Sequence, residues 1–489
     1  MPKPAIDSAS VDAPVKEERS IFEAGQPEPT EMPPHSGIIL GIILVSYFMI
    51  VLNNSIIFTG LPQIRAEMGL SANGMAWAQN AFTLIFGGLL PLGARVGDLL
   101  GRRRVFVIGL VLFGSASFMV GAAETQIWLI GARAFQGVGA AIVAPSSLSL
   151  ITAIFPAGPP RTRAVAAYGT TAGIGASLGM VIGGALASWV SWRAGFFLNV
   201  PLVALLVIAA LLRLPVFDSV RGRFDVIGAI TSTLGMGALV YGVLNVGEHG
   251  WMAPQTYVPI LAGVVVLAIF VITEWRAKEP IMPLRLFASA QRSGAAIARL
   301  LFAGTMIAFY FFGTQYFQDV YGWSPLMAGL GFLPMSLVQL TVSLSVPRLT
   351  ARFGNAALVT TGLVIATAAM GWITQIRPDS SFMVGTAGPL ILLGIGQGIA
   401  FGPLTAAGIA GARTEDAGAA SGLVNTAHQL GSTLGVAVLT SVAAGAVSFE
   451  DQVVGSFMGG TVMLGLAVLA TAALIIPGEL RTRRKEPIA

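Results

Sequence analysis

Ionisable and amide side chains are rare inside the apolar runs of this 489-residue chain, so those present there are the first candidates for chemistry. The adjacent amides Asn53 and Asn54 lie in the apolar run 37–60, and Arg133 and His428 lie well inside later runs. Such groups are costly in hydrocarbon unless they find partners, and they tend to mark substrate and proton pathways. His428 could carry a proton near neutral pH, and Arg133 could bind a carboxylate or a phosphate.

Each of these residues also has a purely structural interpretation. Asn53 could satisfy polar groups across a helix contact or accept a hydrogen bond from Arg133, which could equally be held by Gln136 one turn away. His428 could be a neutral core histidine bonded to a neighbour such as Asn425, which is the more common state of a lone histidine. We expect Arg133 to have a functional role, and the two interpretations of Asn53 remain open.

Further polar and aromatic residues could line a broad apolar cavity. The sequence FYFFGTQYFQ (309–318) brings several aromatic rings onto one helical face, with amides beside them. The same pattern would suit core or lipid-facing aromatics. The candidates for a substrate cavity are Asn53, Asn54, Gln79, Asn80, Arg133, Gln136, Tyr310, Gln315, Tyr316 and Asn425.

Acidic side chains are missing from the middle of every apolar run, although the chain has 23 Asp and Glu residues. They fall in the N-terminal tail, in loops, at the ends of runs or in the C-terminal tail. A lipophilic cation would therefore find no deep counter-ion, and we expect neutral or anionic substrates instead. His428 is the main candidate for proton coupling, together with Arg133. Asp98 and Asp319 are alternatives if they move toward the cavity.

Composition indicates an integral membrane protein. Hydrophobic residues make up 55% of the chain and charged residues only 10%, whereas soluble proteins have about 25% charged residues. About fourteen apolar runs are long enough to cross a bilayer as helices. They lie at 37–60, 75–97, 104–123, 126–153, 164–188, 195–214, 226–247, 256–275, 294–318, 325–347, 356–375, 383–409, 417–446 and 454–477.

The distribution of arginine and lysine predicts the orientation. Alternate loops hold most of these residues, and the opposite loops hold only Arg65, Arg193 and Arg377. By the positive-inside rule, the arginine-rich loops and both termini are cytoplasmic. Residues 1–36 are polar, lack the features of a signal peptide and are expected to be a disordered tail. The net charge of +5 is explained by topology and lipid contacts, with no need for nucleic acid.

Several classes of function are disfavoured by what the sequence lacks. There is no cysteine, and the three histidines are far apart, so no metal site is expected. No phosphate-binding loop of an ATP-driven pump and no serine-nucleophile motif is present. We therefore expect neither an enzyme nor a cofactor.

An internal repeat relates the two halves of the chain. GARVGDLLGRRRV (93–105) follows the second run and PRLTARFGN (347–355) follows the tenth, and RAFQGVGAA (133–141) pairs with LGIGQGIAF (393–401). Such repeats are typical of two-lobed transporters with a site near the middle of the membrane. Asp98, Gly101, Arg102 and Arg103 could form a conformational gate between the lobes, or simply a basic loop that sets topology.

These motifs resemble the major facilitator superfamily and, more narrowly, its fourteen-helix drug:proton antiporters. The resemblance extends from residue 38 to about 478 and includes LIGARAFQGVGAAIVAP (129–145), GIGASLGMVIGG (173–184) with its packing glycines, SWRAGFFLNVP (191–201) and EPIMPLRLF (279–287). The packing glycines are Gly175, Gly179 and Gly183. The chain departs from the family pattern at Asn53, where Asp is usual, at Met180, where Pro is usual, and at His428, where Arg is common.

The resemblance implies an all-α major facilitator fold of two pseudo-symmetric six-helix lobes, 37–214 and 286–478, with two additional helices within 215–285 and a tail at 479–489. It implies a monomeric exporter of small hydrophobic molecules in the cell membrane, working by alternating access, exchanging protons and contacting membrane lipids. A lipid transporter of the same fold and a non-transporting scaffold or sensor are the alternatives.

Overall fold

The computed structural model describes residues 34–156, 158–216, 226–277, 282–377, 382–412 and 417–483, with the single residues 32 and 280. Most of the predicted tail at 1–36, part of the linker at 215–225 and the last six residues lie outside this description. Helices are the only regular secondary structure in the described ranges, which contain no β-strand. The all-α prediction is therefore confirmed.

The first half of the chain forms seven helices, which we call the N-terminal bundle. Their bounds are α2 (Ser36–Met68), α3 (Ala72–Leu100), α4 (Arg102–Gly121), α5 (Gln126–Ile154), α6 (Pro159–Trp189), α7 (Trp192–Phe197) and α8 (Asn199–Arg213). The two helices α9 (Val226–His249) and α10 (Pro254–Arg276) follow.

The remaining helices form the C-terminal bundle. They are the 3-10 helix η1 (Leu284–Ala288), α11 (Ala290–Gln315), the π-helix η2 (Tyr316–Val320), α12 (Pro325–Gly331), α13 (Leu333–Phe353), α14 (Asn355–Ile373), the π-helix η3 (Phe382–Ala387), α15 (Gly388–Ile409), α16 (Ala417–Ala443), α17 (Phe449–Ala470), the π-helix η5 (Thr471–Ile475) and α18 (Ile476–Arg483).

Each predicted apolar run coincides with one of these helical segments to within a few residues. Twelve described segments are long and apolar enough to cross a membrane. α3 and α16, with 29 and 27 residues, run alongside them but are not among the twelve. The protein thus crosses the membrane many times, and the count of fourteen crossings stays a prediction.

Glycines form equivalent turns in the two halves of the internal repeat. Gly101, between α3 and α4, has a φ of 92°, and Gly354, between α13 and α14, has a φ of 86°. Residues with a β-carbon rarely adopt these positive values. Both glycines belong to the repeated loop motif, so the repeat in the sequence corresponds to a repeated turn in the structure.

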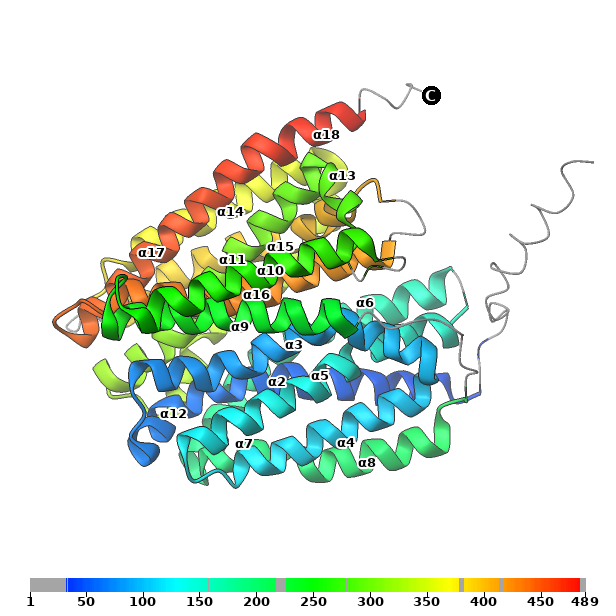
Figure 1. The fold of residues 1–489 in the computed structure, drawn as a ribbon, viewed down its shortest axis with the longest axis horizontal. Coiled ribbons are helices and arrows are strands. Elements are labelled where there is room, and N and C mark those ends of the chain that lie inside the picture. The colour runs from blue at the N-terminus through cyan, green and yellow to red at the C-terminus, as the bar shows by residue number, and fades with distance from the viewer. Residues whose placement is uncertain are drawn as a thin grey trace, which may run out of the picture.

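The two bundles also pack their helices in corresponding pairs. In the N-terminal bundle, α2 packs on α6, α3 on α5 and α4 on α8; in the C-terminal bundle, α11 packs on α16, α13 on α15 and α14 on α17. Figure 1 separates the bundles into a blue-to-teal group below and a yellow-to-red group above, with green α9 and α10 between them. This arrangement matches the predicted pseudo-symmetry.

Close contacts at glycines hold these pairs together. Gly175, Gly179 and Gly183 are buried and face α2; a β-carbon at Gly179 would lie 2.7 Å from Ser55 Cβ, and one at Gly183 would lie 2.8 Å from Ile56 Cα. Helices in lipid associate through packing rather than a hydrophobic driving force, so small residues at the contact favour association. α6 continues without a break through Met180, the position of the missing proline.

α9 connects the two bundles along one seam. It packs on α10, and it also contacts α3 of the N-terminal bundle and α16 of the C-terminal bundle. Gly88 of α3 faces Thr233 of α9, and Gly87, its neighbour, faces Gln429 of α16. Ser441 of α16 donates a hydrogen bond to the Val243 carbonyl of α9.

The bundles meet directly at the end opposite the arginine-rich loops, which we call the opposite end. There Arg65 of α2 pairs with Asp319 of η2 at 2.9 Å. Gln318 Nε2 donates to the Thr59 carbonyl at 3.0 Å. Gly329 of α12 also abuts the Met180 carbonyl of α6. The bundles splay toward the end at which α2 begins (Figure 1), so this structure is closed at the opposite end.

Replacing Gly183 with alanine should lower the midpoint of thermal unfolding. The added methyl would collide with α2, and overpacking of this kind typically costs about 1–3 kcal/mol. Gly169 lies on the same helix, and a β-carbon added there would meet no atom within 4 Å. Gly169→Ala is therefore the matched control and should leave the midpoint unchanged or slightly raised. Tryptophan fluorescence during heating in detergent measures both variants; equal midpoints would contradict the packing argument.

Reversing the charge of Arg65 should separate the bundles at the opposite end. Arg65→Glu would face Asp319 with a like charge, whereas the double variant Arg65→Glu with Asp319→Arg restores an opposite-charge pair. The pair is partly exposed, so we expect a shift of about 0.2–1 kcal/mol between closed and open states. Spin labels on Ile127→Cys and Gln375→Cys report the distance across this end, because the chain has no native cysteine. An unchanged distance distribution in Arg65→Glu would exclude a latching role.

Candidate functional site

Asn53 lies in a polar network that is closed within the N-terminal bundle. Its side-chain amide and that of Gln136 on α5 exchange two hydrogen bonds, each of 3.0 Å. Asn53 and Gln136 are both fully buried. Two further residues complete the network: Ser117 of α4 accepts from Gln136 Nε2 at 2.8 Å, and Asn199 of α8 donates to Asn53 Oδ1 at 3.3 Å. In this state the amide of Asn53 therefore binds protein groups rather than facing an open cavity.

Arg133 places a positive charge beside this network. It is fully buried, its Nη1 donates to Gln136 Oε1 at 2.9 Å, and its Nε donates to the Ala78 carbonyl at 3.1 Å. The guanidinium carbon also lies 4.7 Å from the centre of the Phe82 ring. Arg133 forms no ion pair with any described residue, and its Nη2 finds no hydrogen-bond partner there. Nη2 of this buried cation is therefore available to donate a hydrogen bond.

The sequence SWRAGFFLNVP positions several parts of this site. Ser191 caps α7 by accepting from the Arg193 backbone N–H, and the Trp192 indole and the Arg193 guanidinium both donate to the carboxylate of Glu67 at the end of α2. Asn199, eight residues after Ser191, then enters the network with Asn53. Sequence reasoning identified the motif but missed that Asn199 and Ser117 close the network, because their partners come from helices distant in the sequence.

Asn54, Gln79 and Asn80 form a second group in the N-terminal bundle. Gln79 Nε2 donates to Asn54 Oδ1 at 3.3 Å, and Gln79 and Asn80 are fully buried. Neither amide atom of Asn80 has a partner in the described ranges. Trp77, one turn before Asn80, contacts the Tyr241 ring of α9, and Gly87, two turns after it, faces α16. Asn80 thus lies on the face of α3 at the seam between the bundles.

Of the predicted aromatic residues at 309–318, Tyr310 of α11 lies at the boundary between the bundles. The Tyr310 ring stacks on Phe58 of α2 at 6.1 Å between ring centroids. Gln315 is buried; its Nε2 donates to the Phe311 carbonyl at 2.9 Å, and its Oε1 has no partner among the described residues. Tyr316 is also buried, edge-on to Tyr321. Tyr310 therefore joins the boundary directly.

His428 and Asn425 lie one turn apart on α16, away from Arg133. His428 is partly exposed, and its ring stands edge-on to Phe401 at 6.1 Å. Asn425 is exposed and its Nδ2 donates to the Ser421 carbonyl at 3.1 Å rather than to His428. Arg133 and His428 are held by separate groups of contacts, so the structure does not bring the two coupling candidates together.

The candidate gate residues hold neighbouring helices of their own bundle. Arg102 Nη1 donates to the Ser149 carbonyl of α5 at 3.4 Å, and Arg103 donates to the Leu211 carbonyl of α8. Gly101 forms the turn between α3 and α4. The side chain of Asp98 lies outside the described part of the structure.

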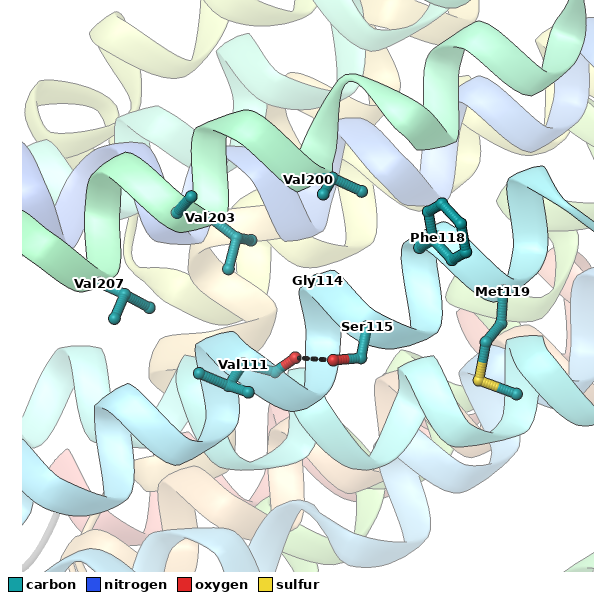
Figure 2. A pocket seen from close by; sticks show the side chains of 9 residues that line it. Val111, Gly114, Ser115, Phe118, Met119, Val200, Val203 and Val207 are labelled. Atoms are coloured by element: carbon teal, nitrogen blue, oxygen red, sulfur yellow. Dashed lines mark hydrogen bonds between the residues drawn. The ribbon is translucent and has the colours of Figure 1, made fainter.

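A pocket of about 520 Å³ lies between α4 and α8, and its lining is almost entirely apolar. Figure 2 shows Val111, Val203 and Val207 along it, with the Ser115 hydroxyl donating to the Val111 carbonyl. It is lined by Val111, Gly114, Ser115, Phe118, Met119, Val200, Val203, Ala204 and Val207. None of the residues predicted for the substrate cavity lines this pocket, which lies on the side of the N-terminal bundle away from the C-terminal bundle (Figure 1).

Comparisons with known proteins agree with this architecture. The cephamycin export protein of Amycolatopsis lactamdurans is 36% identical over 89% of this chain and 91% of its own length. The puromycin resistance protein of Streptomyces alboniger is 35% identical over 89% of this chain and 90% of its own length. A solved peptide transporter superposes with a TM-score of 0.66 at 14% identity, covering 89% of this chain and 94% of its own.

A second solved structure has the same fold. It is a bacterial homologue of the lysosomal transporter Spinster, with a TM-score of 0.65 at 16% identity, covering 91% of this chain and 98% of its own. The family model described as Major Facilitator Superfamily matches residues 43–436. With these relatives and this packing of two bundles, the chain belongs to the Major Facilitator Superfamily.

Proposed function

We propose that this protein is a secondary-active exporter of small hydrophobic molecules, antibiotics among them. The observation that carries the proposal is the likeness, over about nine-tenths of the chain, to proteins named for cephamycin export and puromycin resistance. The fold supports it, because the bundles meet through an ion pair, hydrogen bonds and close glycine contacts between separate helices, and these can separate without unfolding either bundle.

Alternating access follows from this arrangement. The segments 37–214 and 286–478 are the moving lobes, and α9 and α10, within 215–285, follow them at the seam. The arginine-rich end is cytoplasmic by the positive-inside rule. In this proposal, contact between the bundles at the opposite end closes the protein toward the outside, and an exporter would load its substrate from the cytoplasmic side in this state. The protein works as a monomer in the cell membrane.

The substrate is neutral or anionic. The described ion pairs of the bundles, Arg65–Asp319 and Arg193–Glu67, lie at the opposite end, and neither involves the buried cation Arg133. A lipophilic cation entering between the lobes would meet buried positive charge and uncompensated amides. Amide groups such as those of Asn80 and Gln315 can instead hydrogen-bond to a polar group on a neutral molecule.

Proton exchange is the proposed source of energy, as the resemblance to drug:proton antiporters implies. Position 53 holds an amide where those antiporters usually have an acid, so another group must bind the proton. His428 of α16 has a buried ring nitrogen, Nδ1, without a hydrogen-bond partner in the described ranges, and it is the proposed proton carrier. Asp319 and Asp98 are the acids that could share this role.

Transport in proteoliposomes tests the function. With inverted orientation and an imposed proton gradient, we expect gradient-dependent flux of neutral and anionic lipophiles and little flux of matched cations. Ligands should also raise the thermal midpoint; a ligand at 100 times its dissociation constant adds about 2.7 kcal/mol. Absence of both flux and ligand-dependent stabilisation would favour a scaffold or a sensor, and strongest stabilisation by cations would contradict the charge argument.

Replacing Asn53 with aspartate should increase the transport of lipophilic cations. The carboxylate would accept the hydrogen bonds of Gln136 and Asn199, and its charge would offset that of Arg133 in a region of low dielectric. Asn53→Leu, which breaks the amide pair and leaves buried amide atoms unsatisfied, controls for damage to the network and should lower stability by about 1–3 kcal/mol. Cation-to-neutral flux ratios measure the effect; an unchanged ratio in Asn53→Asp assigns Asn53 to structural support alone.

A further inference from the structure

Arg299 is a second buried cation, and it lies on α11, a helix that contacts α2 of the other bundle. Only 3% of the residue is exposed. Its Nη1 donates to the Phe401 carbonyl of α15 at 3.2 Å, and its guanidinium carbon lies 3.8 Å from the centre of the Phe401 ring. Its position near the end of an apolar run suggests from sequence that the side chain extends to the membrane surface, but the structure buries it instead.

The N-terminal bundle carries a stacked pair of tyrosines on α2 and α6. Tyr47 of α2 and Tyr168 of α6 stack with their ring centroids 3.9 Å apart and 16° between their planes. Tyr47 lies on α2 and Arg299 lies on α11, and these two helices contact each other across the boundary between the bundles. Phe401 therefore covers Arg299 on its own side, and the tyrosine pair belongs to the bundle on the other side of the boundary.

His428 completes the group on the C-terminal side. Its ring contacts Phe401 edge-on, and Phe401 is the same side chain that covers the Arg299 guanidinium. Arg299 Nε and His428 Nδ1 both lack hydrogen-bond partners among the described residues. Two polar nitrogen atoms, one of them in a permanently charged group, are thus buried near each other with nothing from the described chain to bind.

No carboxylate among the described residues balances this charge. Arg299 forms no ion pair with any of them, and the described ion pairs lie at the opposite end. Burying a charge without a partner is strongly unfavourable, so a site of this kind gains most from an anion that brings its own charge and accepts hydrogen bonds. Phe401 and the tyrosine pair add flat apolar surfaces on which the hydrophobic part of a ligand can lie.

We propose that Arg299 and His428, with Phe401, Tyr47 and Tyr168, form a binding site for the carboxylate of an amphiphilic, anionic substrate at the boundary between the lobes. Arg299 binds the carboxylate, His428 donates to or accepts from it, and the aromatic rings hold the apolar part. The site rests on the proposed export function and names its substrate class. Because its walls come from both bundles, movement of the lobes would take it apart and release the substrate.

A matched pair of probes tests this site on the purified full-length protein in lipid nanodiscs. The probes are 1-pyrenebutanoate and its neutral amide, which differ in the charge of one group, and empty nanodiscs correct for partition into lipid. We expect the wild-type protein to bind the carboxylate about tenfold more tightly than the amide, as suits a charge-assisted hydrogen bond. Arg299→Gln should bring this ratio close to one while leaving affinity for the amide unchanged. Arg299→Lys should retain part of the preference.

Arg292→Gln is the control for removing an arginine from the same helix. Arg292 donates to the Leu286 and Ala410 carbonyls at the arginine-rich end and lies outside the proposed site. It should keep the wild-type ratio. If Arg299→Gln does not fold, Arg299→Lys and His428→Gln are compared instead, and both should lower the ratio.

The outcomes separate this inference from the function itself. A wild-type ratio near one, or a ratio that Arg299→Gln leaves unchanged, overturns the carboxylate site, even if the amide is bound and exported in proteoliposomes. Equal loss of affinity for both probes in Arg299→Gln assigns Arg299 to structural support and also overturns it. If neither probe nor any other lipophile is bound or transported, the proposed export function fails together with the site.

Discussion

The close approach of helix backbones at glycines is the constraint on which the rest of this structure depends. In a bilayer, apolar side chains gain little by leaving lipid for one another, so helices must associate through packing. Gly179 and Gly183 bring α6 against α2, and a β-carbon at Gly304 would lie 2.7 Å from the Gly431 carbonyl of α16. The same kind of contact closes the lobes at the opposite end, where Gly329 abuts α6. Glycine contacts hold each lobe together, and further glycine contacts join the lobes, at Gly184 and Gly329 between α6 and α12 and at Gly87 between α3 and α16.

Charged side chains are also confined to particular parts of the structure. The ion pairs in the described ranges lie at one end of the molecule, and Arg133 and Arg299 are buried in the bundles without a described carboxylate. Arg133 is held by a network of amides within one lobe, where it supports the lobe and keeps one free donor. Arg299 is held by the backbone carbonyl and the ring of Phe401 in the C-terminal lobe. An arginine can therefore support the fold, as Arg133 does, or be placed to recognise a ligand, as we propose for Arg299.

Much of the fold could be predicted from the sequence because the bilayer requires long apolar helices, and hydropathy reports these directly. The repeat motifs also located Gly101, and the spacing of Gly175, Gly179 and Gly183 identified a packing face. The candidate site was harder to predict from the sequence than the fold. Asn53, Gln136 and Arg133 meet as a group, yet Ser117 and Asn199, which close their network, come from α4 and α8. The burial of Arg299 is not evident from its position along the chain, because the ring that covers it, Phe401, comes from another helix. Position along a span predicts depth, but only tertiary contacts decide which residues surround a side chain.

The position of α9 has a consequence for how the chain is made. The ribosome completes α3 long before α16, and the face of α3 that bears Gly87 and Gly88 is finally covered by both α16 and α9. α9 is synthesised before any helix of the C-terminal bundle, so it can occupy its half of that face as soon as the N-terminal bundle has entered the bilayer. The order of synthesis thus leaves the part of α3 that includes Gly87 to be covered when α16 arrives. During biogenesis, the hairpin of α9 and α10 is therefore the first segment outside the N-terminal bundle that can pack on this face of α3.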